Sequence, residues 1–386
     1  MPSFAQFEER IRSHIRELEN TGLRRHLQPP SGIDLSSNDY LGLASHPLLK
    51  QKMAEAVLES GCGSTGSRLL RGDRAAFAAV ESRFAAFKKT EASLYFGSGY
   101  TANIGVLGTF IERHDVVFTD SQNHASIVDG IRLSRAKRVK FRHCDIDDVA
   151  RKVRAFPDNP IGAQKFLVTE SLFSMDGDFA PLADYAQLCR ETGTVLIVDE
   201  AHAVGVYGES GSGWIEHTRT GSEVFVSVDT AGKAMGVSGA FVSGPEWAVD
   251  YLIQRARPFM FSTAPPPALA AALDASLRVI EQEPERRRRL QELASFLRGV
   301  LVERGVDIGG SQSQIIPVIL GENDRAKSVA AELEHEGFDV RAIRPPAVPP
   351  GTARLRVSVN ALLDEVTLQR FASALLKVRT CSVVSS

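Results

Sequence analysis

Six short apolar segments recur along the middle of the chain, and stretches with helical spacing separate many of them. Short buried strands that alternate with helices are typical of an α/β domain, in which helices sandwich a mostly parallel sheet. Side chains that act on ligands in such sheets lie where the strands end. The expected strands are Val116–Thr119, Val139–Phe141, Phe166–Thr169, Val195–Val198, Val224–Val228 and Ala240–Val242.

The length of 386 residues is more than one compact core usually holds, so we expect more than one domain. Residues 1–45 are predicted to form an N-terminal helix and arm, because apolar residues recur at helical spacing up to Asn20. The charged run 281–291 marks a change in composition. We therefore predict a large α/β domain over residues 46–282 and a small α+β domain over residues 283–386.

Composition excludes several classes of protein. The net charge is -2, so no overall basic field favours nucleic acid. The four cysteines are far apart and show neither CxxC pairs nor metal-ligand spacing, so we expect no metal site and a reducing compartment. No stretch is apolar enough to span a membrane or to act as a signal peptide. We expect a cytoplasmic protein.

One carboxylate follows an apolar run directly. Asp199 ends the segment VLIVD and is predicted to emerge from a buried strand, where a carboxylate is costly unless a positive charge pairs with it. The protonated pyridine nitrogen of pyridoxal 5'-phosphate (PLP) is such a partner, and His202 lies three residues further on, within reach of the phenolic oxygen. A structural ion pair is the alternative. The DEAH letters also occur in helicases, but the chain has no Walker A motif.

A lysine follows the next expected strand. Lys233 lies among small residues in DTAGKAMGVSG, with Thr230 just upstream, an open setting that suits a Schiff-base lysine. Taken alone, an ordinary surface lysine fits this turn as well. Upstream, Gly97-Ser98-Gly99-Tyr100 stands between an expected strand and a helix, which suits either a phosphate site or a plain turn. Together with Asp199, these features predict a PLP site, and His124 offers a ring that can stack on the pyridine.

At this point the chain resembles the α-oxoamine synthases, a family of fold-type I PLP enzymes, nearly from end to end. The blocks SSNDYLGLASHP, FGSGYTAN, NHASIVDG, TESLFSMDGDFAPL, VDEAHAVGVYGESG and TAGKAMGVSGAFVSG occur in the family's order. The resemblance implies a homodimer that condenses an amino acid with an acyl thioester. The member that joins L-alanine to a pimeloyl thioester in biotin biosynthesis is the most similar, on the block AIRPPAVPPGTARLRVSV. Coenzyme A or an acyl-carrier protein would carry the acyl group.

The resemblance also implies roles for individual residues. Lys233 would link to PLP, Asp199 and His202 would contact its ring nitrogen and phenolic oxygen, and His124 would stack on the ring and touch substrate. The remaining residues divide between two tasks. Those assigned to the cofactor are Ser174 and, for the phosphate, Gly99, Tyr100 and Thr230. Those assigned to substrates are Arg356 for the amino-acid carboxylate, and Arg24 and position 347 for the acyl part.

The chain departs from the family pattern in two places. Ala347 stands where threonine is usual, and residues 360–364 lack a histidine that often follows the last strand. Both departures concern the acyl substrate and neither concerns the cofactor. Alternatives therefore stay open: a glycine C-acetyltransferase-like or long-chain acyl enzyme such as a serine palmitoyltransferase, or a non-catalytic partner subunit. A nicotinamide oxidoreductase is excluded because no dinucleotide fingerprint is present.

Overall fold

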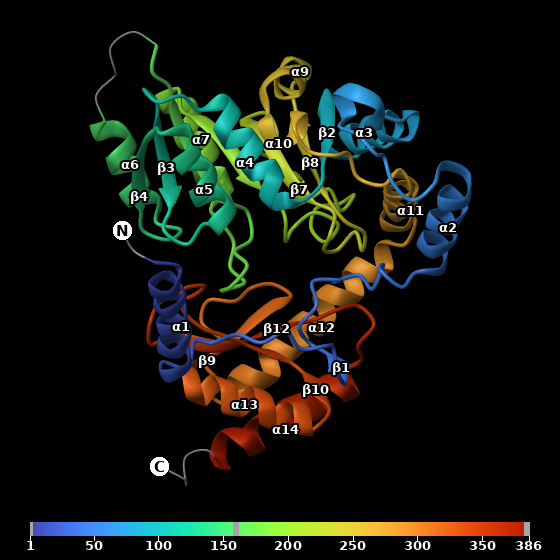
Figure 1. Cartoon of the computed structure of the whole chain (residues 1–386). Coiled ribbons are helices and arrows are strands. Elements are labelled where there is room, and N and C mark those ends of the chain that lie inside the picture. The colour runs from blue at the N-terminus through green and yellow to red at the C-terminus, as the bar shows by residue number, and fades with distance from the viewer. Residues whose placement is uncertain (1–2, 157–161, 382–386) are drawn as a thin grey trace.

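A computed structural model describes residues 3–156 and 162–381, and the largest sheet in this part of the chain has seven strands in the order β2-β8-β7-β6-β5-β3-β4 (Figure 1). The pairs from β7 through β4 are parallel, and β8 runs antiparallel to both of its neighbours. All six expected segments lie within these strands, so the predicted mostly parallel sheet is confirmed. The strands are β2 (Ala92–Phe96), β3 (Val116–Asp120), β4 (Lys137–Phe141), β5 (Lys165–Glu170), β6 (Val195–Asp199), β7 (Val224–Thr230) and β8 (Ala240–Gly244).

Helices cover both faces of this sheet, because successive strand residues point to opposite sides. Val117 packs in a cluster with residues of α4, α5 and α9, whereas Val116 and Phe118 pack with residues of α6 and α7. The faces are thus buried by different helices, as a parallel sheet requires. The helices are α3 (Ala75–Lys88), α4 (Gly99–Phe110), α5 (Ala125–Ser134), α6 (Ile146–Ala155), α7 (Leu182–Thr192), α8 (Trp214–Thr218), α9 (Glu246–Arg255) and α10 (Arg257–Met260).

The C-terminal part contains a separate three-stranded sheet in the order β11-β12-β9. The N-terminal arm lies against this part, because β1 pairs in parallel with β10. Figure 1 shows α12 running from the large sheet into the C-terminal part. The division at residues 45 and 282 stays a prediction. The strands are β1 (Ile33–Asp34), β9 (Ile315–Gly321), β10 (Phe338–Asp339), β11 (Arg341–Ile343) and β12 (Ala353–Ser358), and the other helices are α1 (Phe4–Asn20), α2 (Pro47–Ser60), η1 (Arg68–Gly72), α11 (Ala268–Gln282), α12 (Pro284–Glu303), α13 (Asn323–His335) and α14 (Glu365–Cys381).

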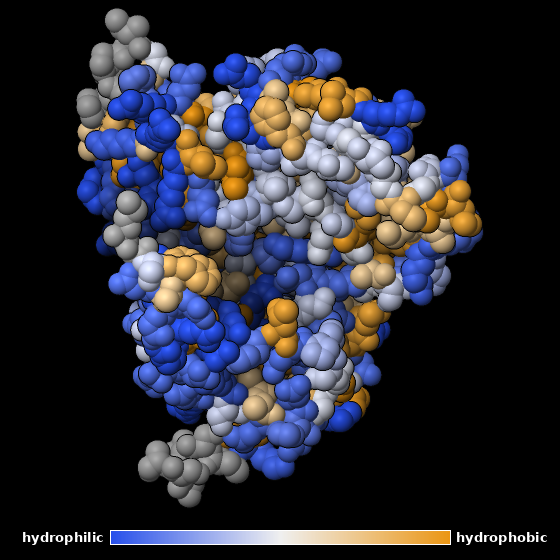
Figure 2. Space-filling model, in the orientation of Figure 1, coloured by the Kyte–Doolittle hydropathy of each residue, from blue (hydrophilic) through white to orange (hydrophobic). Residues whose placement is uncertain are grey.

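Four parallel strands of the large sheet end in polar residues at the same edge. These are Asp120, Glu170, Asp199 and Thr230, the last residues of β3, β5, β6 and β7. Figure 2 shows a hollow between the upper and lower parts of the molecule, bordered mainly by hydrophilic residues. Among the described residues, no helix combines the length and the apolar character needed to cross a bilayer.

Candidate active site

The turn between β7 and β8 fixes the position of Lys233. Gly236 has a φ of 68°, and a Cβ there would lie 2.4 Å from the backbone nitrogen of Ala44, so only glycine fits this close approach. The backbone closes the turn with bonds from Gly236 N–H to Lys233 O at 2.8 Å and from Val237 N–H to Ala231 O at 3.1 Å. The lysine side chain is therefore presented from a tightly held segment.

His202 connects Lys233 to a second group of polar side chains. Its Nε2 lies 2.7 Å from Lys233 Nζ, and its Nδ1 lies 2.7 Å from the hydroxyl of Tyr40. Burial, assisted by the charges of Lys233 and Arg356, holds the pKa of His202 well below its ordinary value. The imidazole is therefore neutral at physiological pH, with one nitrogen that donates and one that accepts.

Asp199 is a buried carboxylate that lacks a cationic partner. Its Oδ2 accepts from Asn103 Nδ2 at 2.7 Å, and its Oδ1 accepts from the backbone of Ala201 at 2.8 Å. Within residues 3–156 and 162–381, no lysine, arginine or histidine forms an ion pair with it. Because an unpaired buried charge is costly, this carboxylate is suited to a positive group supplied by a ligand.

Arg356, on β12, is a buried cation, whereas Asp199 is a buried anion. Its guanidinium donates to Ser174 O at 2.5 Å, to Ser358 Oγ at 2.8 Å and to the Tyr40 hydroxyl at 3.3 Å, and the residue is 7% exposed. No carboxylate of the described chain pairs with it, whereas Arg354 two residues earlier pairs with Asp176 at 2.6 Å. A buried guanidinium with only neutral partners is suited to a substrate carboxylate.

The first turn of α4 offers N–H groups that suit an anion. Ser98 caps the helix by accepting from the backbone of Thr101, which leaves the first N–H groups of the helix, at Gly99 and Tyr100, for an anion. A Cβ on Gly99 would lie 2.3 Å from Thr230 Oγ1, so the absence of a side chain there lets the Thr230 hydroxyl lie close to the start of the helix. The N–H groups at the start of α4 and the nearby Thr230 hydroxyl suit a phosphate, and the choice between a phosphate site and a plain turn stays a prediction.

We expect Gly99→Ala to weaken phosphate binding by about tenfold or more, because the new methyl group displaces Thr230 and lost charge-assisted hydrogen bonds have effects of that size. Titration of the cofactor-free protein with PLP, followed by absorbance, measures the change. Gly108→Ala is the matched control, since it lies in the same helix with no atom within 4 Å of its Cβ position. Equal affinities in the two variants would contradict this prediction.

His124 and Glu170 complete the surroundings of Asp199. His124 caps α5, its backbone N–H donates to Glu170 Oε1 at 2.6 Å, and its Nδ1 lies 2.8 Å from Ser126 Oγ. Burial lowers the pKa of His124, so its ring is neutral and free to stack on a flat ligand. Burial and the nearby charge of Asp199 raise the pKa of Glu170 to about 8.

The predicted site residues fall into two sets. The described hydrogen bonds connect Lys233 through His202 and Tyr40 to Arg356, and Arg356 binds the backbone oxygen of Ser174. Arg24 lies apart on the N-terminal arm, in an ion pair with Glu19 at 2.9 Å. Ala347 lies apart as well, exposed in the loop after β11.

Two residues of this network were not predicted from the sequence. Tyr40 contacts both His202 and Arg356, and Asn103 contacts Asp199. Tyr40 stands in the block SSNDYLGLASHP, which resembles a block of the family but does not by itself indicate a role for its tyrosine. Asn103 lies inside a helix, where a single buried amide gives no periodic signal.

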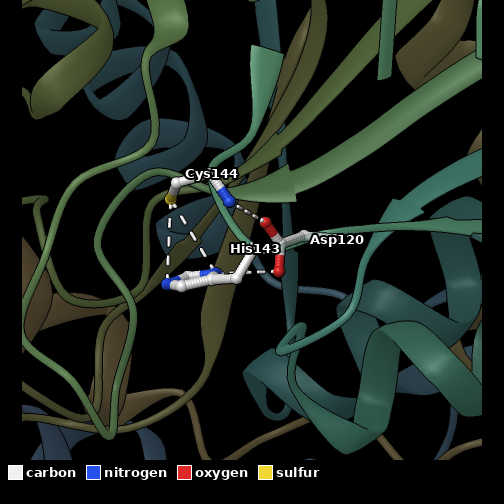
Figure 3. Close-up of side chains that lie close together, drawn as sticks. All are labelled: Asp120, His143 and Cys144. Carbon is white, nitrogen blue, oxygen red and sulfur yellow. Dashed lines mark hydrogen bonds and ion pairs between the residues drawn. The ribbon is translucent and has the colours of Figure 1, made fainter. Parts of the chain in front are cut away.

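A separate cluster joins Asp120, His143 and Cys144, whose potential metal-ligand atoms lie within 4.8 Å of one another (Figure 3). Both ring nitrogens of His143 already face carboxylates, Asp120 at 2.9 Å and Asp178 at 2.8 Å. Burial opposes its charge, but the hydrogen bonds to these carboxylates dominate and raise the pKa of His143 to about 12. A protonated imidazole is no metal ligand, so the cluster is an ion-pair network that ties the end of β3 to the loop after β5.

Comparison with known proteins gives the family of this chain. The sequence profile of the aminotransferase class I and II family matches residues 30–375. The chain belongs to this family. An 8-amino-7-oxononanoate synthase of Anaeromyxobacter dehalogenans (strain 2CP-1) is 46% identical over 385 residues, which covers 95% of each chain.

Two solved structures share the fold over most of their length. A serine palmitoyltransferase from S. paucimobilis with a PLP–myriocin adduct bound has a TM-score of 0.89 at 28% identity, covering 98% of this chain and 100% of the other. The 8-amino-7-oxononanoate synthase of Francisella tularensis has a TM-score of 0.79 at 29% identity, covering 92% of this chain and 99% of the other. The chain is therefore a PLP-dependent transferase of fold type I, and the recognised resemblance and the predicted cofactor are confirmed.

The residues present fit this cofactor. Asp199, which has no ion-pair partner among the described residues, matches a protonated ring nitrogen, and the N–H groups at the start of α4 with the Thr230 hydroxyl beside them match a phosphate. His124 is neutral and exposed, which leaves its ring open to stacking, and the amine of Lys233 lies beside neutral His202. The individual contacts of PLP with these residues remain predictions.

We expect the cofactor-free protein to capture PLP faster as the pH rises through about 8. Burial lowers the pKa of Lys233 to about 8, against the opposing charges of Asp199 and Glu170, and only the neutral amine attacks an aldehyde. Below that pH the amine holds its proton, and above it the rate levels off. Stopped-flow absorbance measures the rate, with N-acetyl-lysine amide as the control because its amine titrates near 10.4. A rate that stays constant between pH 7 and 9 would contradict the assigned pKa.

Proposed function

We propose that the protein condenses L-alanine with a pimeloyl thioester to give 8-amino-7-oxononanoate, carbon dioxide and the free thiol carrier, in biotin biosynthesis. The strongest support is the 46% identity, over 95% of both chains, with a relative that bears the name of this activity. The guanidinium of Arg356 supports an amino acid as one substrate, because it is buried and no carboxylate of the described residues pairs with it.

The residues divide the work as follows. PLP, when bound, supplies a ring that withdraws electrons from the α-carbon of an amino acid. Asp199 holds the proton on the ring nitrogen, and Arg356 binds the carboxylate of alanine. Lys233 removes the α-proton of alanine and later returns a proton to the same carbon. His202, neutral and 2.7 Å from Lys233 Nζ, keeps this amine oriented.

The bonds of the overall reaction balance. A carbon–carbon bond forms between the α-carbon of alanine and the thioester carbonyl, and the carbon–sulfur bond breaks to release the thiol. The carbon–carbon bond to the carboxylate of alanine then breaks with loss of carbon dioxide, and the α-carbon receives a proton. Neither the cleavage of the carbon–sulfur bond nor the loss of carbon dioxide changes the overall oxidation state, so the reaction needs no oxidant or reductant.

Product identification tests the proposal directly. PLP-loaded protein supplied with L-alanine and pimeloyl-coenzyme A should release 8-amino-7-oxononanoate, detected by mass spectrometry, together with one thiol per product. Alanine labelled with ¹³C at the carboxylate should release the label as carbon dioxide. Thiol release without the amino-oxo acid would refute the proposed reaction.

A long-chain acyl enzyme is the second candidate. It is favoured by the TM-score, which is 0.89 for the serine palmitoyltransferase and 0.79 for the F. tularensis synthase. Ala347, in place of the usual threonine, also leaves room near the expected acyl path. A panel of L-serine, glycine and L-alanine against acetyl, pimeloyl and palmitoyl thioesters separates the candidates by thiol release.

We also propose that the protein is a cytoplasmic homodimer. The apolar face of α1 supports a second copy as its cover, because the helix has no buried residue although five of its residues are large and apolar. Their exposure is Phe4 79%, Phe7 49%, Ile11 40%, Ile15 40% and Leu18 42%. Exposed apolar residues of this number are unusual on a monomer. Sedimentation analysis should give twice the mass of one chain.

A further inference from the structure

A basic groove of about 870 Å³ lies between the N-terminal arm and the C-terminal sheet. Five cationic side chains line it: Arg24, Arg25, Lys327, Arg341 and Arg344. Three of them are neutralised by ion pairs with nearby carboxylates. These are Arg24 with Glu19 at 2.9 Å, Lys327 with Asp324 at 2.8 Å and Arg341 with Asp339 at 2.7 Å.

The other two arginines, Arg25 and Arg344, have no carboxylate partner in the described part of the chain. Arg25 donates to the backbone oxygen of Pro345 at 3.1 Å, and Arg344 donates to the backbone oxygen of Gly22. Asp324 is close enough for its charge to affect Arg344, but its ion pair is with Lys327. Backbone oxygens orient the two guanidiniums without cancelling their charges, so two like charges face the same groove.

The groove approaches the active site along β11. Arg341, in its wall, pairs in register with Arg356 on the neighbouring strand β12. Arg344 follows the last residue of β11, and the register there places it beyond the level of Arg354, so it lies farther from Arg356 than Arg341 does. Ser36 and Ser37 also line the groove, and the same segment continues to Tyr40, which contacts His202 and Arg356.

We infer that Arg25 and Arg344 bind a phosphate of the group that carries the acyl thioester. This inference rests on the proposed function. A pantetheine arm with its thioester at one end and a phosphate at the other is common to coenzyme A and to acyl-carrier proteins, so the shared ligand is the phosphate of that arm. The arm would place its thioester near Lys233 while its phosphate stays at the groove.

The geometry favours the carrier end over the free carboxylate of a pimeloyl chain. The groove is at the surface, where a bulky carrier stays outside, and Arg25 is exposed there. Two adjacent guanidiniums match the charge and the oxygen spacing of a phosphate, whereas a single carboxylate would need only one of them.

The test compares three pimeloyl thioesters: those of coenzyme A, of an acyl-carrier protein, and of pantetheine, which has no phosphate. In the double variant Arg25→Met, Arg344→Met, we expect KM for the first two to rise about tenfold or more, because charge-assisted hydrogen bonds are lost. We expect kcat, and KM for the pantetheine thioester, to stay within twofold of the unaltered protein. Arg325→Met is the control, since Arg325 lies on α13 beside Asp324 but does not line the groove.

Other outcomes would overturn the inference. An equal rise in KM for all three thioesters would assign the arginines to the acyl chain, and a rise for the carrier protein alone would assign them to its protein surface. Calorimetry with 4'-phosphopantetheine and with pantetheine gives a readout independent of turnover. The unaltered protein should bind the phosphorylated form more tightly, and the double variant should bind both equally. If no thioester yields product while this binding difference persists, the proposed function fails and the phosphate site stands.

Discussion

Lys233→Ala should lower turnover by at least about 10³-fold, because the variant loses the amine that removes and returns the α-proton. The fold should persist, since the turn is held by backbone hydrogen bonds and by Gly236 rather than by the lysine side chain. Steady-state product formation measures the loss, and circular dichroism checks the fold.

Two observations sharpen the Lys233 prediction. Lys52→Ala, at an exposed lysine on α2 paired with Glu55, should leave turnover unchanged. Reduction of the PLP-loaded protein with borohydride should attach the cofactor covalently to residue 233 in the unaltered protein, and mass spectrometry of peptides locates the attachment. Turnover near normal in Lys233→Ala would rule out its assigned role.

Asp199→Asn should lower kcat by about 10³-fold, equivalent to about 4 kcal/mol in the activation barrier. The amide keeps the shape of the side chain but cannot hold a proton on the ring nitrogen, so the ring loses much of its electron-withdrawing power. The loss should appear in kcat more than in the KM for alanine, because Arg356 still binds the carboxylate.

The Asp199 prediction has a spectroscopic check and a matched control. The absorbance of the PLP-loaded variant should shift as the ring nitrogen deprotonates. Asp250 lies on α9 and is not one of the candidate site residues, so Asp250→Asn should change neither kcat nor the spectrum. If the variant retained full kcat, the pairing of this carboxylate with the cofactor would be wrong.

The sequence predicts the fold best where patterns within a short segment determine the structure. Apolar runs predict the strands of the large sheet, and because parallel strands end at one edge, Asp199 and Lys233 are expected in the same region. Lys233 and His202 prove to be 2.7 Å apart although 31 residues separate them. A βαβ arrangement makes such a meeting predictable.

Contacts between distant segments escaped prediction for a physical reason. Tyr40 meets His202 across 162 residues and Arg356 across 316, and these meetings depend on how the arm and the C-terminal sheet pack against the large sheet. Neither Arg356 nor Asp199 has an ion-pair partner among the described residues, and this is a property of the packed interior that no local pattern encodes.

Arg356 lies on β12, in the C-terminal sheet, while Lys233 follows β7 of the large sheet. If both contact the amino-acid substrate as proposed, two separate parts of the fold bind one small molecule. Substitutions around β12 could then change which amino acid is bound without altering the turn after β7 that carries Lys233. On the proposed roles, selectivity for the amino acid and reactivity of the amine have separate structural origins, so substitutions during evolution can change the substrate while the chemistry stays the same.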